Sequence, residues 1–406
     1  MREKRLNNGC GPISLAAVLV AIFVACGLSE VGVPEIPEAE EQDGISSPFR
    51  TICCISGFEY PSGYDWNGEP QAGEVRCSLV VFADGVPKIK VPVGDGYEVS
   101  RDYDMHRVIQ GNLYTFYSKA GRTVIRRNGA PLFRYDGDEV LVDMSVKDNN
   151  VYTLAHRRTG GGFAFRKNGN ILVERLAGET YGRLWNDGDS LCFAFMQPVA
   201  LADGMEYRHY IVYDERVERL EVADDIEKIW DLQSGCGIPC ILASLESISG
   251  TFICRDGSRK RIEMPDSAGM LSCRLFQADS LMGAECMYGY PDGRCESGIW
   301  VEGSEYVRFE AGRSIQGLKY ERGKAYCVLN PDVDEGIIYS AGILEKMPQG
   351  YFCLDDRALA VHDGSFHVAM SSKNGNRPII WNDGRTDTLR LNGCVSSITF
   401  TELKGG

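Results

Sequence analysis

Residues 163–169 of the chain read Phe163-Ala164-Phe165-Arg166-Lys167-Asn168-Gly169, an apolar run that ends in a turn pair. Asn-Gly and Asp-Gly supply the positive φ angles that a two-residue hairpin turn requires, so this pair predicts a tight turn between antiparallel strands. The same unit recurs from about residue 50 onward. Its eight copies reach their turns at Asp84, Asn128, Asn168, Asp214, Asp256, Glu302, Ala341 and Asp383.

Successive turn positions are 44, 40, 46, 42, 46, 39 and 42 residues apart, a mean of about 43. Further apolar runs precede most turns, for example residues 150–155 and 238–243. Four short strands in such a period are typical of a β-propeller blade. We therefore predict an all-β protein with a single propeller of eight blades, each of four antiparallel strands. Seven blades is the alternative if the Glu302 or the Ala341 copy is an irregular insertion.

The two ends of the repeat predict how the ring closes. The first copy, near residues 51–93, has room for only about three strands, whereas residues 392–400 form one lone strand-like run after the last turn. A C-terminal strand that completes the N-terminal blade removes the exposed edges of an open array. We therefore expect the propeller domain to span residues 50–406.

The N-terminus carries an export signal. Arg2, Lys4 and Arg5 precede an apolar run of 12 residues, which is too short for a membrane-spanning helix of about 20 residues. The segment Phe23-Val24-Ala25-Cys26 resembles the lipobox of bacterial lipoproteins, in which small residues precede a diacylated cysteine. We predict a signal peptide at residues 1–25, lipidation of Cys26, and a flexible acidic tether at residues 26–49.

Net charge limits the partners. The formal charge of −14 becomes about −16 when residues 1–25 are removed, because they contain three basic residues and one acidic residue. Neutralising phosphates requires concentrated Lys and Arg, so nucleic acid and anionic membrane surfaces are excluded as expected partners. Membrane attachment is then expected through the lipid anchor alone, and we expect a monomer.

The 15 cysteines do not form the pattern of a disulfide scaffold. Cys10 lies in the signal peptide and Cys26 takes the lipid, which leaves 13, an odd number over about 350 residues. Many lie inside apolar strand-like runs, as in Leu191-Cys192-Phe193, and are interpreted as small buried hydrophobic residues. A disulfide between Cys236 and Cys240 stays open.

The repeat resembles the propellers of secreted lipoproteins of gut-type Bacteroidetes, most of which have no assigned activity. The resemblance rests on the short Asn/Asp-Gly units and covers about 350 residues. It implies the propeller fold and an envelope location, namely a bacterial outer-membrane lipoprotein on the periplasmic or cell-surface side. It implies no catalytic residue.

Catalytic and metal-binding motifs are missing from the sequence. It contains no nucleophile elbow, HExxH, phosphate-binding loop or GxGxxG, so we predict no cofactor and no metal. One acidic segment, which contains Asp332, Asp334 and Glu335, leaves calcium binding open, although it departs from an EF-hand loop and is more simply a solvated turn.

Ligand binding is predicted on the face that carries the loops between the second and third strands of the blades. These loops vary, as in residues 156–162 and 196–206, whereas the Asn/Asp-Gly turns are mostly short and uniform. A basic island lies there in part: residues 119–167 contain ten basic and five acidic residues. Arg157 and Arg158 are the candidate ligand-binding residues, for bidentate contacts to a carboxylated or sulfated glycan or an acidic protein. Balancing of local acids is the simpler explanation for this island.

Two functional hypotheses follow. The first is an envelope-anchored lipoprotein that uses one variable propeller face as a non-catalytic binding or scaffold module for a glycan or an envelope protein. The alternative is a carbohydrate-active enzyme, a glycoside hydrolase or lyase, with its site at the central channel. Fold alone does not separate them. Tyr181, Trp185, Tyr288 and Tyr290 are candidates for stacking on sugar rings, although the apolar strand context of Trp185 favours core packing between blades.

Overall fold

We analysed a computed structural model of the protein. It describes residues 49–60, 77–92, 106–119, 121–201, 204–235, 237–246, 250–262, 268–278, 281–304, 306–309, 313–331, 336–354, 356–373 and 377–404. Residues 47–406 form one compact unit, which contains the whole propeller. The predicted signal peptide, lipidated Cys26 and residues 26–48 of the predicted tether lie outside the described residues, whereas Phe49 is the first residue of β1.

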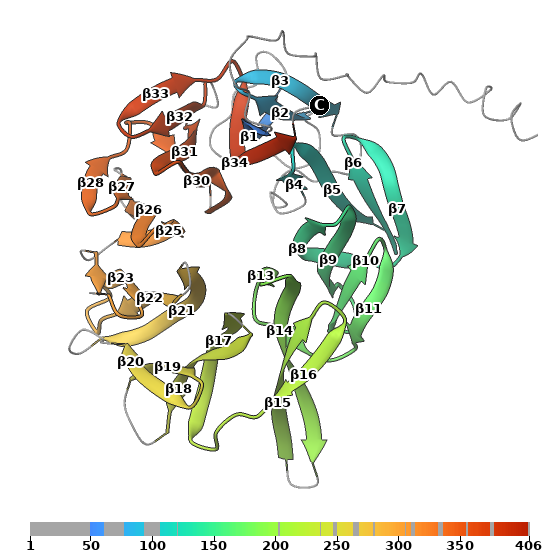
Figure 1. The fold of residues 1–406 in the computed structure, drawn as a ribbon, viewed down its shortest axis with the longest axis vertical. Coiled ribbons are helices and arrows are strands. Elements are labelled where there is room, and N and C mark those ends of the chain that lie inside the picture. Colours follow the sequence, from blue (N-terminus) through green and yellow to red (C-terminus); the bar gives the residue numbers. More distant parts are fainter. Residues whose placement is uncertain are drawn as a thin grey trace, which may run out of the picture. The chain divides into compact units, whose positions relative to one another are not determined.

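The described residues form eight antiparallel sheets arranged as the blades of a ring (Figure 1). From the innermost strand outward, blade 1 contains β34 (Gly393–Lys404), β1 (Phe49–Glu59), β2 (Ser78–Ala83) and β3 (Val86–Pro92); blade 2 contains β4 (His106–Ile109), β5 (Asn112–Lys119), β6 (Arg122–Arg127) and β7 (Ala130–Asp136); blade 3 contains β8 (Glu139–Lys147), β9 (Asn150–Arg157), β10 (Phe163–Lys167) and β11 (Asn170–Arg175); blade 4 contains β12 (Glu179–Thr180) and β13 (Trp185–Asp187), which both pair with β14 (Ser190–Leu201), then β15 (Gly204–Tyr213) and β16 (Arg216–Leu220).

The second half of the ring repeats this order. Blade 5 contains β17 (Ile226–Gly235), β18 (Ile238–Leu245), β19 (Thr251–Arg255) and β20 (Ser258–Ile262); blade 6 contains β21 (Gly269–Ala278), β22 (Leu281–Gly289), β23 (Cys295–Val301) and β24 (Val307–Arg308); blade 7 contains β25 (Arg313–Glu321), β26 (Lys324–Pro331), β27 (Ile337–Ser340) and β28 (Ile343–Lys346); blade 8 contains β29 (Tyr351–Phe352), the 3-10 helix η2 (Asp356–Ala358), β30 (Leu359–His362), β31 (Ser365–Ser372), β32 (Ile379–Asn382) and β33 (Arg385–Thr388).

These sheets confirm the eight-bladed propeller, and the seven-blade alternative is wrong. The irregular Glu302 and Ala341 copies end the third strands of blades 6 and 7, so neither is an insertion. The predicted ring closure is also confirmed, because the C-terminal strand β34 is the inner strand of blade 1 and pairs with β1 from Phe49↔Lys404 to Glu59↔Gly393.

One recurrent contact explains why the turn positions are Asn or Asp. The turn residue has φ near +50°, which Asn and Asp tolerate better than most residues, at 84, 128, 168, 214, 256 and 383. At 84, 128, 168 and 214 the side-chain oxygen of this residue accepts a bond from a backbone N–H near the start of the second strand of its blade, and its own N–H donates back to the same residue. In blade 3, Val151 N–H bonds Asn168 Oδ1 at 2.9 Å, and Asn168 N–H bonds Val151 O at 2.8 Å.

The same two-bond contact, which we call the turn clamp, joins Asp84 to Cys53, Asn128 to Leu113 and Asp214 to Leu191. In blade 7 the turn residue is Ala341, which keeps the backbone bond to Ala325 O at 3.1 Å and the positive φ of 51° but has no side-chain acceptor. The clamp is therefore incomplete in the one blade whose turn carries Ala.

Blade-to-blade packing forms the core. Between blades 3 and 4, Phe163, Phe165, Phe193 and Phe195 are fully buried, with ring centroids 4.9 Å apart for Phe163–Phe195 and for Phe165–Phe193. Cysteines fill smaller spaces, since Cys192, Cys240, Cys327 and Cys394 are all fully buried. The expectation that strand cysteines act as small hydrophobic residues is confirmed for these four.

One predicted loop is wrong. The variable loop predicted at residues 196–206 is replaced in large part by strand, because β14 extends to Leu201 and β15 begins at Gly204, with register from Met196↔His209 to Leu201↔Gly204 (Figure 1). In the returning strand, residues 205–208 (Met-Glu-Tyr-Arg) alternate apolar and polar side chains, a pattern typical of a β-strand. Its far end exposes Leu201, Met205 and Tyr207.

A histidine joins blades 1 and 2 at the closure. His106 of β4 is buried, and its Nε2 lies 2.9 Å from Ser396 Oγ of β34 and 3.3 Å from Ser56 Oγ of β1. Burial, with smaller contributions from Arg357 and Arg107, lowers the pKa of His106 from 6.5 to about 3. The imidazole is therefore neutral in the folded protein at physiological pH.

The turn clamp predicts that two substitutions change the free energy of unfolding in opposite directions. Asn168→Ala removes two hydrogen bonds, from Val151 N–H and to Asn150 Oδ1, and places Ala at positive φ, so the free energy of unfolding should fall by about 1.5–3 kcal/mol. Ala341→Asn should raise it by about 1 kcal/mol, because Asn tolerates the existing φ and can complete the clamp. Equilibrium urea denaturation of both variants measures these changes. Equal effects of the two substitutions would contradict the role assigned to the turn residue.

His106 predicts acid sensitivity of the closure. Between pH 6.5 and about 3 the unfolded chain binds a proton at this histidine that the folded protein does not, so stability falls as the pH falls through this window. At pH 4.5 this loss amounts to about 2–3 kcal/mol relative to pH 7.5. Denaturation of the parent and of His106→Gln at both pH values isolates the effect. The Gln variant should lose less stability on acidification, and equal losses would refute the assignment.

Candidate functional site

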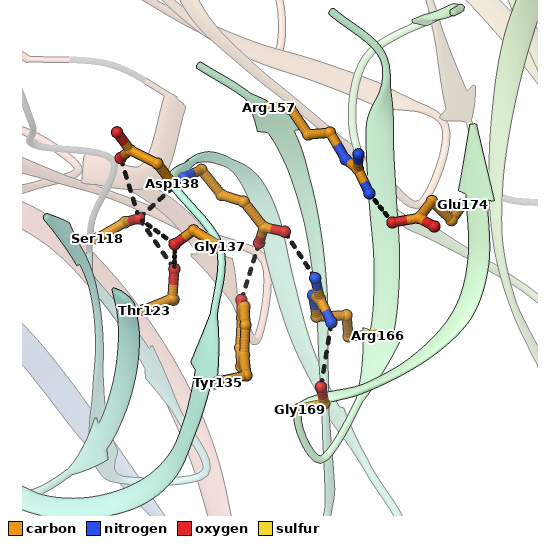
Figure 2. Close-up of polar contacts among 10 residues, drawn as sticks. Ser118, Thr123, Tyr135, Gly137, Asp138, Arg157, Arg166, Gly169 and Glu174 are labelled. Atoms are coloured by element: carbon orange, nitrogen blue, oxygen red, sulfur yellow. Dashed lines mark hydrogen bonds and ion pairs between the residues drawn. The ribbon is translucent and has the colours of Figure 1, made fainter. Parts of the chain in front are cut away.

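The two predicted ligand-binding arginines lie at the end of β9, on the face that carries the loops between second and third strands. Arg157 forms an ion pair with Glu174 of β11 in the same blade (Figure 2). Arg158 Nε lies 3.2 Å from Asp138 Oδ1, and the Arg158 N–H donates to Asp138 O at 2.9 Å. Both guanidinium groups therefore already contact carboxylates of their own or the preceding blade, and a ligand would have to displace them.

A third arginine of the basic island has a structural role. Arg166 of β10 is buried, and its Nη2 donates to Glu139 Oε1 at 2.8 Å, while the Tyr135 hydroxyl donates to Glu139 Oε2 at 2.9 Å (Figure 2). Its guanidinium carbon lies 4.1 Å from the centroid of the Tyr135 ring. Since Tyr135 belongs to blade 2 and Glu139 and Arg166 belong to blade 3, these contacts hold the two blades together.

The opposite face carries a cavity between blades 3 and 4. We call it the turn-face cavity, since its walls come from the turns between first and second strands and between third and fourth strands. Its volume is about 440 Å³, and it is lined by Lys147, Asp148, Asn150, Tyr152, Lys167, Tyr213, Asp214, Glu215 and Arg216. Two residues of the basic island, Lys147 and Lys167, therefore lie here and not on the loop face.

The lining of the turn-face cavity is polar and balanced in charge, with three cationic and three carboxylate side chains. Lys147 Nζ lies 3.3 Å from Asp214 Oδ1. Lys167 and Arg216 lie over the rings of Tyr152 and Tyr213, at 5.7 Å and 5.3 Å from the centroids. Such a surface offers hydrogen-bond donors and acceptors at close range, which suits a polyhydroxylated ligand.

The inner strands carry a second set of polar groups, which join neighbouring blades. Asp143 of β8 accepts from Leu184 N–H of blade 4 at 3.0 Å and from Arg107 of blade 2 at 3.3 Å. Asp231 of β17 accepts from Leu275 N–H of blade 6 at 2.7 Å. A β-bulge lies immediately before each aspartate, at Leu141/Asp143 and Ile229/Asp231.

Burial raises the pKa of Asp231 to about 6. The backbone N–H groups of Leu275 and Leu232 donate to this carboxylate and offset part of the increase. The carboxylate is used to hold backbone of the next blade, so its shifted pKa has a structural cause.

An ion pair connects blades that face each other across the ring. Arg183, between β12 and β13 in blade 4, binds the carboxylate of Asp356 on η2 in blade 8. Burial alone would raise the pKa of Asp356, but Arg183, Lys319 and Arg274 outweigh it and lower that pKa. The other oxygen, Oδ1, is buried and has no hydrogen-bond partner among the residues that the structure describes.

A second carboxylate interacts electrostatically with this pair. Glu285 of β22 accepts from Arg274 of β21 at 2.7 Å. Burial raises the pKa of Glu285, and the nearby charge of Asp356 raises it further. The guanidinium of Arg274 offsets only part of this increase. The environments thus push the two pKa values apart, Glu285 upward and Asp356 downward. We call Arg183, Arg274, Glu285 and Asp356 the axial cluster.

Gly317 on β25 makes room for the helix that carries Asp356. A Cβ on Gly317 would lie 2.7 Å from Asp356 Cα and 2.9 Å from Asp356 N, closer than real Cβ contacts. The backbone of η2 therefore packs directly on an inner strand at a point where only glycine fits.

Sequence reasoning placed no residue of the axial cluster. The sequence signal for this cluster was weak: Arg274 is a charged residue inside an apolar strand segment, and Asp356 lies just before another. The aromatic residues predicted to stack on sugar rings differ in their exposure. Tyr288 is fully buried and unable to stack on a ligand, whereas Tyr181 donates to, or accepts from, His209 Nδ1 at 2.7 Å and is only partly buried.

Several predictions fall on residues outside the described ranges, namely those for Cys26, Cys236, Asp332, Asp334 and Glu335. Within the described ranges, no three His, Cys, Asp or Glu side chains gather closely enough to hold a metal ion. The same ranges contain no helix with the length and apolar character needed to cross a membrane.

Comparison with known proteins adds only a likeness of fold. No family model and no curated protein matches the sequence. The propeller domain of the Trilobed protease from Pyrococcus furiosus is 9% identical with a TM-score of 0.43, over 68% of this chain and 87% of that chain. The acylaminoacyl peptidase from Pyrococcus horikoshii is 9% identical with a TM-score of 0.44, over 77% of this chain and 59% of that chain.

A third similar structure is TolB from Acinetobacter baumannii, which is 8% identical with a TM-score of 0.33, over 86% of this chain and 82% of that chain. The chain spans little more than half the length of the Pyrococcus horikoshii peptidase. Likenesses at this level carry no statement about activity or ligand.

The close packing at Gly317 makes a prediction about the axial cluster. Gly317→Ala should lower the free energy of unfolding by about 1–3 kcal/mol, because the added methyl group must displace η2 and Asp356 with it. Gly204→Ala is a matched control, since a Cβ on Gly204 meets no atom within 4 Å. Chemical denaturation compares the two variants. Unchanged stability of the Gly317 variant would show that η2 can shift without cost.

Proposed function

We propose that this propeller is the binding module of an exported lipoprotein, anchored to the bacterial outer membrane through Cys26, and that it binds carbohydrate in the turn-face cavity. Support for the anchor is the lipobox-like segment that ends at Cys26, after a basic start and a short apolar run. The observation that carries the binding role is the cavity of about 440 Å³, whose lining combines three cationic and three carboxylate side chains.

The chemistry of this cavity favours a neutral glycan over a polyanion. Three carboxylates balance three cations, so a sulfated chain gains no net attraction there, whereas sugar hydroxyls can donate to Asp and Glu and accept from Lys and Arg. The ion pairs of Arg157 and Arg158 support the same preference, because an acidic ligand on the loop face must first displace Glu174 and Asp138. An envelope protein remains the alternative partner.

A second candidate function is glycoside cleavage at the axial cluster. The observation that favours it is the pair of carboxylates with opposite pKa shifts, Glu285 upward and Asp356 downward. Glycoside hydrolases use two carboxyl groups, one with a raised pKa as the general acid and one that stays ionised. The arginines beside them are suited to hold an acidic sugar.

Glycan binding is tested with residues 47–406, the compact unit. We expect binding on a neutral-glycan array and by calorimetry. The double variant Lys167→Ala/Arg216→Ala should weaken binding at least tenfold, because it removes two of the cationic side chains that line the cavity. Arg157→Ala/Arg158→Ala is the matched control and should bind as the parent does. The reverse result would assign binding to the loop face. Release of reducing sugar that depends on Glu285 and Asp356 would favour the enzyme, and no binding to any glycan would contradict the proposal.

A further inference from the structure

Two cysteines lie directly opposite each other in blade 6. Cys273 of β21 pairs in register with Cys286 of β22, next to the Arg274↔Glu285 pair. Residues opposed in this way in an antiparallel sheet have Cα atoms about 4.5–5.5 Å apart, inside the range that a disulfide spans. The two Sγ atoms are 2.7 Å apart. No backbone movement is needed to bring them together.

The surroundings of these thiols give them no other role. Both are buried, at 8% and 1% exposure, in an apolar cluster with Leu242, Leu275 and Met282. Within the described ranges, no group of His, Cys, Asp or Glu around them is suited to a metal ion. Burial, together with the contact to Cys286, raises the pKa of the Cys273 thiol well above its usual range, so it is not a ready nucleophile in the folded protein.

We propose that Cys273 and Cys286 form a disulfide across the inner hairpin of blade 6 when the protein folds in an oxidising compartment. A disulfide-bearing oxidant, either a protein disulfide or oxidised glutathione, receives the two electrons. One cysteine thiolate attacks a sulfur of the oxidant and releases its first thiol. The second cysteine then attacks the mixed disulfide, forms the Cys273–Cys286 bond and releases the second thiol of the oxidant.

Burial decides when this reaction occurs. A thiolate must reach the oxidant, but in the finished blade both sulfurs are shielded and the thiolate of Cys273 is disfavoured. The bond therefore forms while β21 and β22 pair and before blades 5 and 7 cover them. Once formed, it resists reduction for the same reason. It ties together the two strands that carry Arg274 and Glu285 of the axial cluster.

Tryptic peptide mapping tests the pairing directly. The full chain is refolded with oxidised glutathione, its remaining thiols are blocked with N-ethylmaleimide in denaturant, and it is digested without reduction. Cleavage after Arg261, Arg274 and Arg294 places Cys273 and Cys286 in separate peptides, 262–274 and 275–294, each with one cysteine. We expect these peptides as one cross-linked species that reduction separates. Two singly blocked peptides would overturn the proposal, as would linkage of either one to Cys240.

Thermal stability provides a second measurement. Oxidised protein should melt about 3 °C or more above reduced protein, because the bond restricts the unfolded chain. Cys273→Ala/Cys286→Ala should show no such dependence on reductant, whereas Cys254→Ala, at a half-buried cysteine of β19, should keep it. A shift of equal size in the double variant would also overturn the proposal. If the double variant does not fold, peptide mapping of the parent chain still decides.

Discussion

The pairing of β34 with β1 holds the ring closed, and the position of every other blade depends on it. Eleven residues of β1 pair with the C-terminal strand, although more than 330 residues separate the paired segments along the chain. Gly57 makes the close approach possible, because a Cβ there would lie 2.4 Å from Cys394 O. Without this pairing, the edges of β1 and β34 would both be exposed. Bringing the two ends of the chain together costs conformational entropy, and the hydrogen bonds between β1 and β34 offset that cost.

Within the closed ring, two kinds of polar contact stabilise the blades at different radii. The turn clamps at 84, 128, 168 and 214 hold each hairpin together within its own blade. Nearer the axis, Asp143 and Asp231 bind the backbone of the next blade, and Tyr135 of blade 2 donates to Glu139 of the buried Glu139–Arg166 pair in blade 3. Buried polar groups are costly unless they are fully bonded, so these contacts favour one relative placement of adjacent sheets.

The fold separates charged residues that are neighbours in sequence and brings together others that are far apart in sequence. The basic island, continuous in sequence, is divided: Arg157 and Arg158 lie on the loop face, Arg166 is buried, and Lys147 and Lys167 line the turn-face cavity. Conversely, Arg183 and Asp356, which are 173 residues apart, form one ion pair. A propeller exposes the two ends of every strand on opposite faces, so neighbours in sequence are often separated and distant inner-strand residues are brought together.

The sequence by itself determined the fold class and the way the ring closes, and it favoured eight blades over seven. Those properties depend on local chemistry, since Asn-Gly and Asp-Gly turns require positive φ and the spacing of about 43 residues counts the blades directly. Even the weak copies at Glu302 and Ala341 follow the period. Only the tertiary structure decided which charged residues are free to meet a ligand. The partners of Arg157, Asp356 and Glu285 come from other strands or other blades, and the contact between Cys273 and Cys286 depends on strand register, which no local pattern in the sequence specifies.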